Sequence, residues 1–290
     1  SGTDRRMKRK INLPPNLKKP MRISACQMVS GLDPEENVLH ALKLIGATAE
    51  SGAELVVLPE HFACVDRDDR SLLAVAESFN NGPIQDAIRT AALRHNVWIC
   101  AGSVPIACDD SHFYNACIVY DPKGETAARY DRIHRFEYRR GNDEAYDESR
   151  FVQAGANPVS FRLTTWDGVE LRVGLALGFD LRFPELFRSL GTCDLILLPA
   201  TFTETTGRAH WATLLAARAI ENQCYVAAAA QGGLHECGRR TWGHSRLIDP
   251  WGNMVSELPS GEGIVIGDID PKLIANVRAM LPALDARVLY

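Results

Sequence analysis

A carboxylate and a turn are the features of this sequence that point to chemistry. Glu60 closes the apolar run LVVLPE, and a carboxylate at the end of a buried strand can act as a general base on an amide. Residues 173–190, VGLALGFDLRFPELFRSL, read as a buried strand that turns sharply into a helix. A nucleophile on such a turn is exposed, and nearby N–H groups can stabilise an oxyanion. The residue at this turn is Gly178, which offers no nucleophile.

The charged segment 129–151, RYDRIHRFEYRRGNDEAYDESRF, holds further candidates. We expect most of it to be a solvated loop. His134 could serve as a general base, but no Ser or Cys motif supplies a nucleophile for it. A structural, hydrogen-bonding histidine is the favoured interpretation. Glu60 likewise has an ordinary alternative, as a surface residue or a helix cap.

Composition narrows the classes of protein. The 290 residues are 46% hydrophobic and 23% charged, with a net charge of −4, so we expect a globular protein without bulk attraction for nucleic acid or membranes. No apolar run reaches the ~18 residues of a membrane helix, and the N-terminus lacks a signal-like apolar stretch, so the predicted location is cytoplasmic. The eight cysteines form no CxxC pair or Cys/His cluster, which predicts reduced core thiols and no metal or disulfide.

The chain divides into a short arm and one domain. Residues 1–20 carry seven Lys or Arg, one Asp and three Pro, which predicts a flexible basic arm; contact with an anionic surface is the alternative to a plain solvated tail. Strands and helices alternate over residues 21–290, which predicts an α/β domain. A helix is expected over 34–52 with Val38, Leu39, Leu42 and Ile45 on its buried face. The segments VYDPKGE and LIDPWGN predict hairpins.

These segments, in this order, resemble the carbon–nitrogen hydrolase (nitrilase) superfamily over residues 21–290. The landmarks are ACQM, LVVLPEHF, YDRIHRFE, GFDLRFPELFRSLG and DLILLPATF, and residues 205–253 are especially similar to the Nit1-like branch, whose members are amidases acting on deaminated glutathione. The resemblance implies a four-layer αββα sandwich, paired through helices into a homodimer or a higher homo-oligomer. It implies hydrolysis of amides or nitriles with no cofactor.

The resemblance also implies a site built from a Glu–Lys–Cys triad and a second Glu. Glu60 matches the general base and Glu148 the second glutamate. The lysine position is occupied by Arg132, and the cysteine position by Gly178. We expect Arg132 to form ion pairs with Glu60 or Glu148, and a small void at Gly178 facing Glu60 and Arg132. The residues expected to line the substrate region are Phe179, Phe202, Glu204, His210 and Trp211, with core packing as an equal alternative for Trp211.

The replacement of both the lysine and the cysteine of the family's triad favours loss of amide hydrolysis. Enzymes supply roughly 10⁶-fold acceleration or more, whereas about 10³ to 10⁴-fold survives when a serine protease loses its nucleophile. Cys193 and Cys224 are expected to be buried, inert thiols. The leading hypothesis is a catalytically impaired homologue whose pocket binds a small amide or carboxylate ligand, or which acts through a partner protein. The alternatives are an amidase engineered at Gly178 or using an unusual mechanism, and a scaffold that acts through its basic arm.

Overall fold

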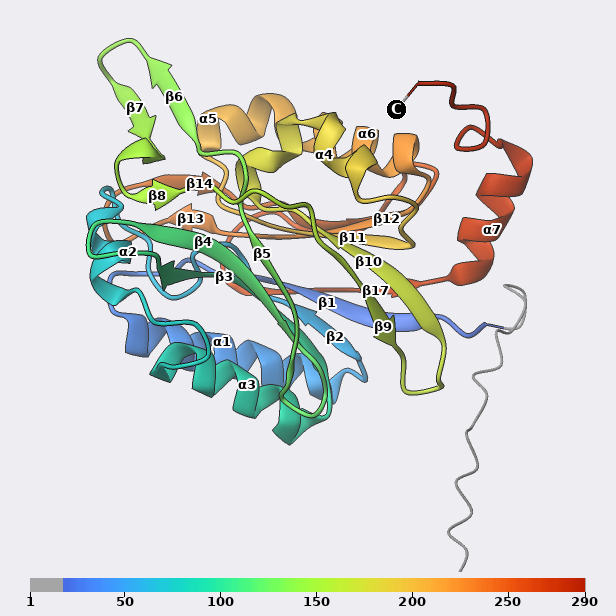
Figure 1. Cartoon of the computed structure of the whole chain (residues 1–290), viewed down its shortest axis with the longest axis horizontal. Helices are drawn as coiled ribbons and strands as arrows, with labels where there is room; N and C mark the ends of the chain where they lie inside the picture. The colour runs from blue at the N-terminus through green and yellow to red at the C-terminus, as the bar shows by residue number, and fades with distance from the viewer. Residues whose placement is uncertain (1–17, 290) are drawn as a thin grey trace, which may run out of the picture.

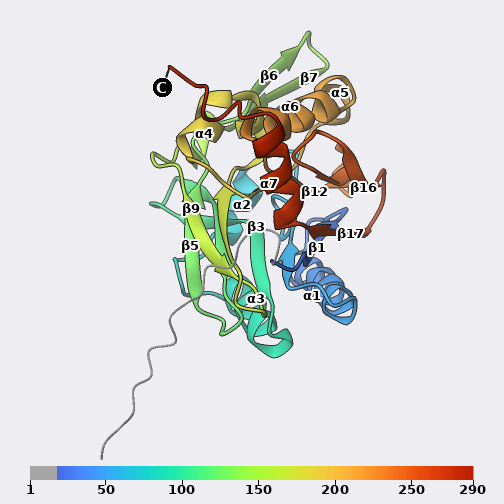
Figure 2. The ribbon, with the colours of Figure 1, turned by 90° about the vertical axis from the view of Figure 1, so that its right-hand side faces the viewer.

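The computed structural model describes residues 18–289 of the chain, shown as a ribbon in Figure 1. The predicted basic arm over residues 1–20 lies outside the described residues except for its last three. The described part contains two large β-sheets that pack face to face, each covered on its outer side by helices (Figures 1 and 2). The predicted α/β class and the four-layer αββα sandwich are thereby confirmed.

The first sheet has seven strands. In spatial order they are β17 (Gly263–Ile269), β1 (Met21–Gln27), β2 (Leu55–Val57), β3 (Trp98–Ala107), β4 (Phe113–Tyr120) and β5 (Thr126–Asp131), with β8 (Val152–Gln153) beside β4. The central pairs β1–β2 and β2–β3 are parallel. Every residue of β2 is buried, as expected for a parallel strand covered on both faces.

The second sheet has six strands. Their spatial order is β16 (Met254–Leu258), β15 (Ser245–Ile248), β12 (Tyr225–Ala230), β11 (Leu195–Ala200), β10 (Glu170–Leu175) and β9 (Ser160–Thr164). Strands β10, β11 and β12 are parallel neighbours, and all residues of β11 and β12 are buried. The predicted hairpins at VYDPKGE and LIDPWGN are confirmed, because β4 pairs with β5 and β15 with β16 in antiparallel register.

Helices form the two outer layers. Helices α1 (Pro34–Glu50) and α3 (Pro83–His95) cover the first sheet, and α4 (Pro184–Ser189) and α6 (Ala212–Asn222) cover the second (Figure 1). The other helices are α2 (Arg70–Val75), α5 (Glu204–Thr206), α7 (Pro271–Met280), and the short turns η2 (Glu148–Arg150), η3 (Gly178–Arg182) and η4 (Gly207–Trp211). Within the described residues, no helix has the length and apolar character needed to cross a bilayer.

Helix α1 shows how the sequence sets these layers. The Asp33 side chain accepts a hydrogen bond from the Glu35 amide at 3.0 Å, which caps the N-terminus. The predicted buried face is partly wrong, because Leu39 is 62% exposed. The buried side chains are Asn37, Ala41, Leu44, Ile45 and Thr48. Their spacing of three and four residues is the helical period, and the buried polar Asn37 and Thr48 shift the face away from Leu39.

The segment expected to be a solvated loop contains a hairpin instead. Strands β6 (Glu137–Arg140) and β7 (Glu144–Asp147) pair in antiparallel register and project from the body of the molecule (Figure 1). Tyr138 lies opposite Tyr146, and the Phe136 ring lies 5.4 Å from the Tyr146 ring. Aromatic cross-strand pairs stabilise a short hairpin, and the high charge of this segment concealed them.

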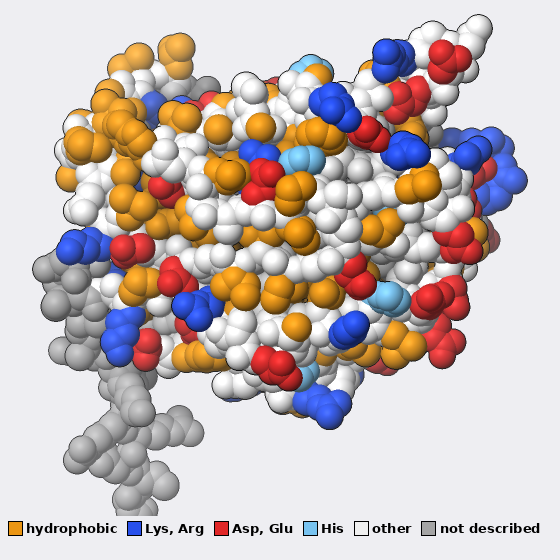
Figure 3. All heavy atoms as spheres, turned by 180° about the vertical axis from the view of Figure 1, so that it is seen from behind, with side chains coloured by type: hydrophobic (Ala, Val, Ile, Leu, Met, Phe, Trp, Pro, Cys, Tyr) orange, Lys and Arg blue, Asp and Glu red, His pale blue; other side chains and the backbone are white. Residues whose placement is uncertain are grey.

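The surface carries charges of both signs. Figure 3 shows acidic and basic side chains interspersed over the face opposite to that of Figure 1. Exposed apolar side chains lie at the ends of α6 and α7 and on the β15–β16 hairpin, and include Ile220, Trp251, Met254, Met280 and Leu281. The predicted homo-oligomer stays a prediction.

Candidate active site

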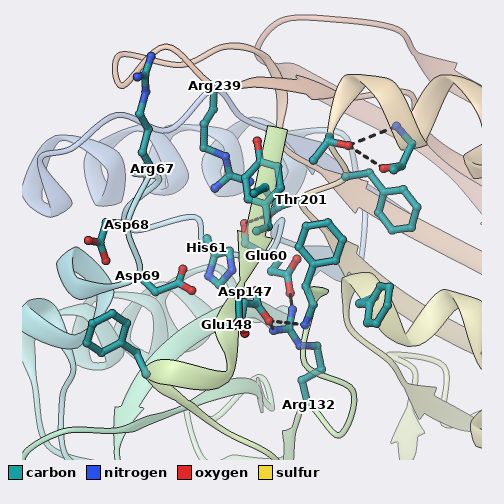
Figure 4. Close-up of a pocket in the computed structure, with 18 of the residues that line it drawn as sticks. Glu60, His61, Arg67, Asp68, Asp69, Arg132, Asp147, Glu148, Thr201 and Arg239 are labelled. Atoms are coloured by element: carbon teal, nitrogen blue, oxygen red, sulfur yellow. Dashed lines mark hydrogen bonds and ion pairs between the residues drawn. The ribbon is translucent and has the colours of Figure 1, made fainter. Parts of the chain in front are cut away.

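The site is a cavity of about 250 Å³ between the two sheets and the β6–β7 hairpin (Figure 4). Its lining includes three of the residues expected to do chemistry: Glu60, Arg132 and Glu148. Glu60 follows β2, Arg132 follows β5, and Glu148 begins η2. The fold therefore brings Arg132 to Glu60, 72 positions away in the sequence, and to Glu148, 16 positions away.

Glu60 is held through one of its two carboxylate oxygens. It is 2% exposed, and its Oε2 atom accepts hydrogen bonds from Asn115 Nδ2 at 2.9 Å and from Arg132 Nη1 at 2.8 Å. Within residues 18–289, its Oε1 atom has no hydrogen-bond donor. A surface or helix-cap role for Glu60 is therefore wrong, because its carboxylate is buried and bound by the side chains of Asn115 and Arg132.

Arg132 bridges two buried glutamates. Its guanidinium donates to Glu60 from Nη1 and to Glu148 from Nη2, and Glu148 also accepts from the Phe136 amide at 2.8 Å. The expected ion-pair cluster is present. Burial alone would lower the pKa of Arg132, but the carboxylates of Glu148 and Glu60 outweigh burial and raise it above its usual value.

Gly178 does not face an empty space. It opens η3 with a φ of +45°, a conformation that favours glycine. A Cβ built on its backbone would lie 2.5 Å from Glu60 Oε1 and 3.0 Å from Glu60 Oε2. The expected void at Gly178 is therefore wrong. Because residue 178 has no Cβ and Arg132 fixes the other oxygen, the Glu60 carboxylate lies where the side chain would begin.

Asp180 fixes the turn that holds Gly178. Its buried carboxylate accepts hydrogen bonds from the Leu177 amide at 3.0 Å, from Tyr130 Oη at 2.6 Å and from His134 Nδ1 at 2.7 Å. The His134 ring stacks on Phe183 with centroids 3.6 Å apart. These contacts confirm the interpretation of His134 as a structural, hydrogen-bonding histidine.

Two of the five residues expected near the substrate line the cavity. These are Phe179 and Phe202. Trp211 lies behind Phe202 at a centroid distance of 4.8 Å and is fully buried, with its indole N–H donating to the His244 carbonyl, so it packs in the core.

The other two lie outside the cavity. Glu204 pairs with Arg208 at 2.8 Å and borders a neighbouring hollow. His210 is exposed on the surface, where its Nδ1 lies 3.1 Å from Arg182 Nη1. The geometry therefore does not support contact between a ligand in this cavity and Glu204, His210 or Trp211.

The cavity also contains polar residues that sequence reasoning missed. His61 and Asp69 line it, as do Arg182 and Arg239. Burial lowers the pKa of His61 to about 3, so its imidazole is neutral at physiological pH. Burial, helped by the nearby Glu148 carboxylate, raises the pKa of Asp69 to about 7. His61 directly follows Glu60 and could have been found by that adjacency, whereas Asp69 lies in the charged run DRDDR and had no distinguishing signal.

No cysteine side chain of residues 18–289 lines the cavity. Six of the eight cysteine side chains are buried, as expected for core thiols. Burial raises the pKa of Cys193 to about 11 and raises that of Cys224 further, so both are inert thiols. Neither lines the cavity. Within residues 18–289, no group of three or more His, Cys, Asp or Glu side chains is arranged to hold a metal ion.

Comparisons with known proteins place this architecture in one family. A sequence model of the family described as carbon–nitrogen hydrolase matches residues 22–279. The deaminated glutathione amidase of Synechocystis is 37% identical over 278 residues, covering 93% of this chain and 99% of that protein. The deaminated glutathione amidase of Yersinia enterocolitica is 36% identical over 271 residues, covering 92% of each chain.

Solved structures agree. The nitrilase and fragile histidine triad fusion protein of Caenorhabditis elegans superposes with a TM-score of 0.83 at 35% identity, covering 93% of this chain. This chain spans only 65% of that protein's chain. A carbon–nitrogen hydrolase superfamily protein of Xanthomonas campestris superposes with a TM-score of 0.79 at 30% identity, covering 94% of this chain and 99% of that one. This chain therefore belongs to the carbon–nitrogen hydrolase family.

Proposed function

We propose that this protein is a catalytically impaired member of the carbon–nitrogen hydrolase family that binds a small amide or carboxylate ligand without cleaving it. The observation that carries the proposal is the arrangement at Gly178. The position that aligns with the family's nucleophile has no side chain, and the Glu60 carboxylate lies 2.5 Å from where a Cβ would be. A thiol ester cannot form at a residue without a thiol.

The second departure supports the same conclusion. In the family, a lysine ammonium stabilises the oxyanion, and Arg132 stands at that position. Both of its Nη groups are engaged, one by Glu60 and one by Glu148. These two carboxylates fix the orientation of the guanidinium, so it does not offer an oxyanion the freely oriented point charge of a lysine ammonium.

Hydrolysis of deaminated glutathione or a related linear amide is the alternative function. It is favoured by the names of the relatives, several of which are deaminated glutathione amidases. Under this alternative, a group other than a thiol would attack the carbonyl. The two functions share a ligand and differ in whether amine is released.

The test combines binding with reversion. Calorimetry on the full chain, with deaminated glutathione and glutaramate as probes, is expected to show saturable binding, and absence of binding by both probes would contradict a retained pocket. The double variant Gly178→Cys with Arg132→Lys is expected to gain amine release that the unaltered chain lacks. A double variant that binds the probes but stays inactive would contradict the view that only the chemistry was lost.

We also propose that the protein forms a homo-oligomer. The apolar side chains at the ends of α6 and α7 support the proposal that two copies pair there, as the family resemblance implies. Light scattering on the full chain is expected to give twice the mass of one chain. A protein partner is a further proposal, and proteins recovered with the full chain under native conditions are the direct check.

A further inference from the structure

Two polar side chains that line the cavity, those of His61 and Asp69, take no part in the cluster around Arg132. His61, just after β2, and Asp69, just before α2, project into the cavity near Glu60 and Glu148 (Figure 4). Within residues 18–289, neither the His61 ring nor the Asp69 carboxylate makes a hydrogen bond or an ion pair. His61 is buried and Asp69 is half-buried, and polar groups at such sites are usually hydrogen-bonded, so both side chains can take a ligand in the cavity as their partner.

The backbone fixes the orientation of His61. Its φ is +56°, which is unusual for a residue with a side chain. Its amide donates to Ser103 Oγ at 3.0 Å, and its carbonyl accepts from the Cys64 amide at 3.2 Å. The ring is only 8% exposed. A strained and well-anchored backbone that presents an unpaired ring to a cavity is typical of a functional position.

Asp69 sits where an aspartate would normally cap a helix. It is the N-cap residue of α2, yet its side chain makes no capping hydrogen bond, although such a bond would stabilise the helix. Its carboxylate lines the cavity instead. The charged groups that act on it are Glu148, Asp68, Arg132 and Arg239. Of these, Arg132 is already bound to Glu60 and Glu148.

We propose that His61 and Asp69 together recognise an uncharged carboxamide group of the ligand and discriminate against the corresponding carboxylic acid. The His61 ring N–H donates to the amide oxygen, and the amide N–H donates to the Asp69 carboxylate. This inference rests on the proposed function, because it assumes that the cavity binds a small amide or carboxylate. It adds that the amide is preferred over the carboxylate, and that His61 and Asp69 determine this preference.

The charges bound to one another beside Asp69 support this preference. Glu60 and Glu148 contribute two negative charges and Arg132 one positive charge. An ionised Asp69 adds a further negative charge, so it repels a ligand carboxylate placed beside it. A carboxylate also has no N–H to donate to Asp69. A buried site that leaves a polar group unpaired rejects the wrong ligand strongly.

The other cations that line the cavity are Arg67, Arg150, Arg182 and Arg239. Arg67 donates to the Cys237 carbonyl, and Arg150 lies over the Phe151 ring. Arg239 donates to the Asp66 carbonyl at 3.1 Å and lies over the Tyr146 ring. Arg182 contacts His210 and lies over the Phe202 ring. Arg182 and Arg239 can bind a second carboxylate at the far end of the ligand. Asp69 still discriminates between an amide and an acid at the near end.

The preference should depend on pH. Because burial holds the pKa of Asp69 at about 7, its carboxyl group is largely neutral at pH 6 and largely ionised at pH 8. A neutral carboxyl group no longer repels an acid and can itself donate to it. The discrimination between amide and acid should therefore be strong at pH 8 and weak at pH 6.

Calorimetric titration with glutaramate and glutarate tests this inference. The two ligands share a distal carboxylate and differ only in the amide or acid at the other end. We expect the full chain at pH 8 to bind glutaramate at least about tenfold more tightly than glutarate. We expect the ratio to fall severalfold at pH 6. Equal or tighter binding of glutarate at pH 8 overturns the inference while leaving the proposed function standing; no binding of either ligand contradicts both.

Three variants separate recognition from packing. Asp69→Asn is expected to bring the ratio at pH 8 to within about threefold and to remove its pH dependence, and His61→Phe is expected to weaken glutaramate binding by about tenfold. The control is Asp110→Asn, an exposed aspartate away from the cavity, which should behave as the unaltered chain. An unchanged ratio in Asp69→Asn, or unchanged glutaramate binding in His61→Phe, overturns the inference. The pH dependence of the unaltered chain tests it even if a variant fails to fold.

Discussion

Glu60 Oε1 lies 2.5 Å from the point where a Cβ on residue 178 would be. A real Cβ cannot approach a carboxylate oxygen so closely, so glycine at 178 and this position of the Glu60 side chain require one another. Arg132 completes the arrangement, because it holds the other Glu60 oxygen at 2.8 Å. The two departures from the family pattern are therefore parts of one local structure.

Adding a side chain at this turn should destabilise the protein. Gly178→Ala introduces a Cβ at a φ of +45° and against Glu60, so we expect the free energy of unfolding to fall by about 1–3 kcal/mol. Denaturant titration measures this change. The control is Gly46→Ala in α1, where a Cβ meets no atom within 4 Å; there we expect a gain of about 0.5–1 kcal/mol. A Gly178→Ala protein as stable as the original would show that Glu60 moves aside freely.

Removing the bridge between the two glutamates should cost more. Arg132→Met leaves Glu60 and Glu148 buried without their shared cation, and breaking a buried ion pair on one side typically costs about 3–5 kcal/mol. Denaturant titration at pH 8 measures this loss. Arg132→Lys, which keeps the charge, should lose less. An equal loss in both variants would show that packing, rather than charge, is what Arg132 provides.

Asp69 should make the protein less stable as pH rises. Its pKa is raised from 3.8 to about 7 in the folded state, so the folded chain binds the proton more tightly than the unfolded chain. Stability then falls between about pH 4 and pH 7 and stays lower above that range. Asp69→Asn should be more stable than the original protein at pH 8 and equal to it at pH 4, measured as thermal unfolding. A difference that is the same at both pH values would assign the effect to packing.

Much of the fold could be predicted from the sequence, because its signals are local. Apolar runs such as LVVLPE and DLILLPATF mark buried strands, and DPKG and DPWG mark hairpin turns. The β6–β7 hairpin could not be predicted in this way. Its stability comes from Phe136, Tyr138 and Tyr146, which meet only after the strands pair.

The site was predictable only where residues have fixed places in a family pattern. Glu60, Arg132 and Glu148 meet as expected. The sequence could not predict that the Glu60 carboxylate occupies the space next to Gly178. The position of this carboxylate depends on how the Glu60 side chain packs when residue 178 has no Cβ. Asp69 reaches the cavity only because its side chain turns away from the helix it would cap.

The rate of amine release from deaminated glutathione tests the central claim most directly. The full chain and the Synechocystis amidase, which is 37% identical, should be compared at equal concentration in the same buffer. Loss of a nucleophile leaves at most about 10³ to 10⁴ of an acceleration of roughly 10⁶ or more. We therefore predict a rate at least about 100-fold below that of the relative and no higher than that of a heat-killed control. A rate within about tenfold of the relative would contradict the account.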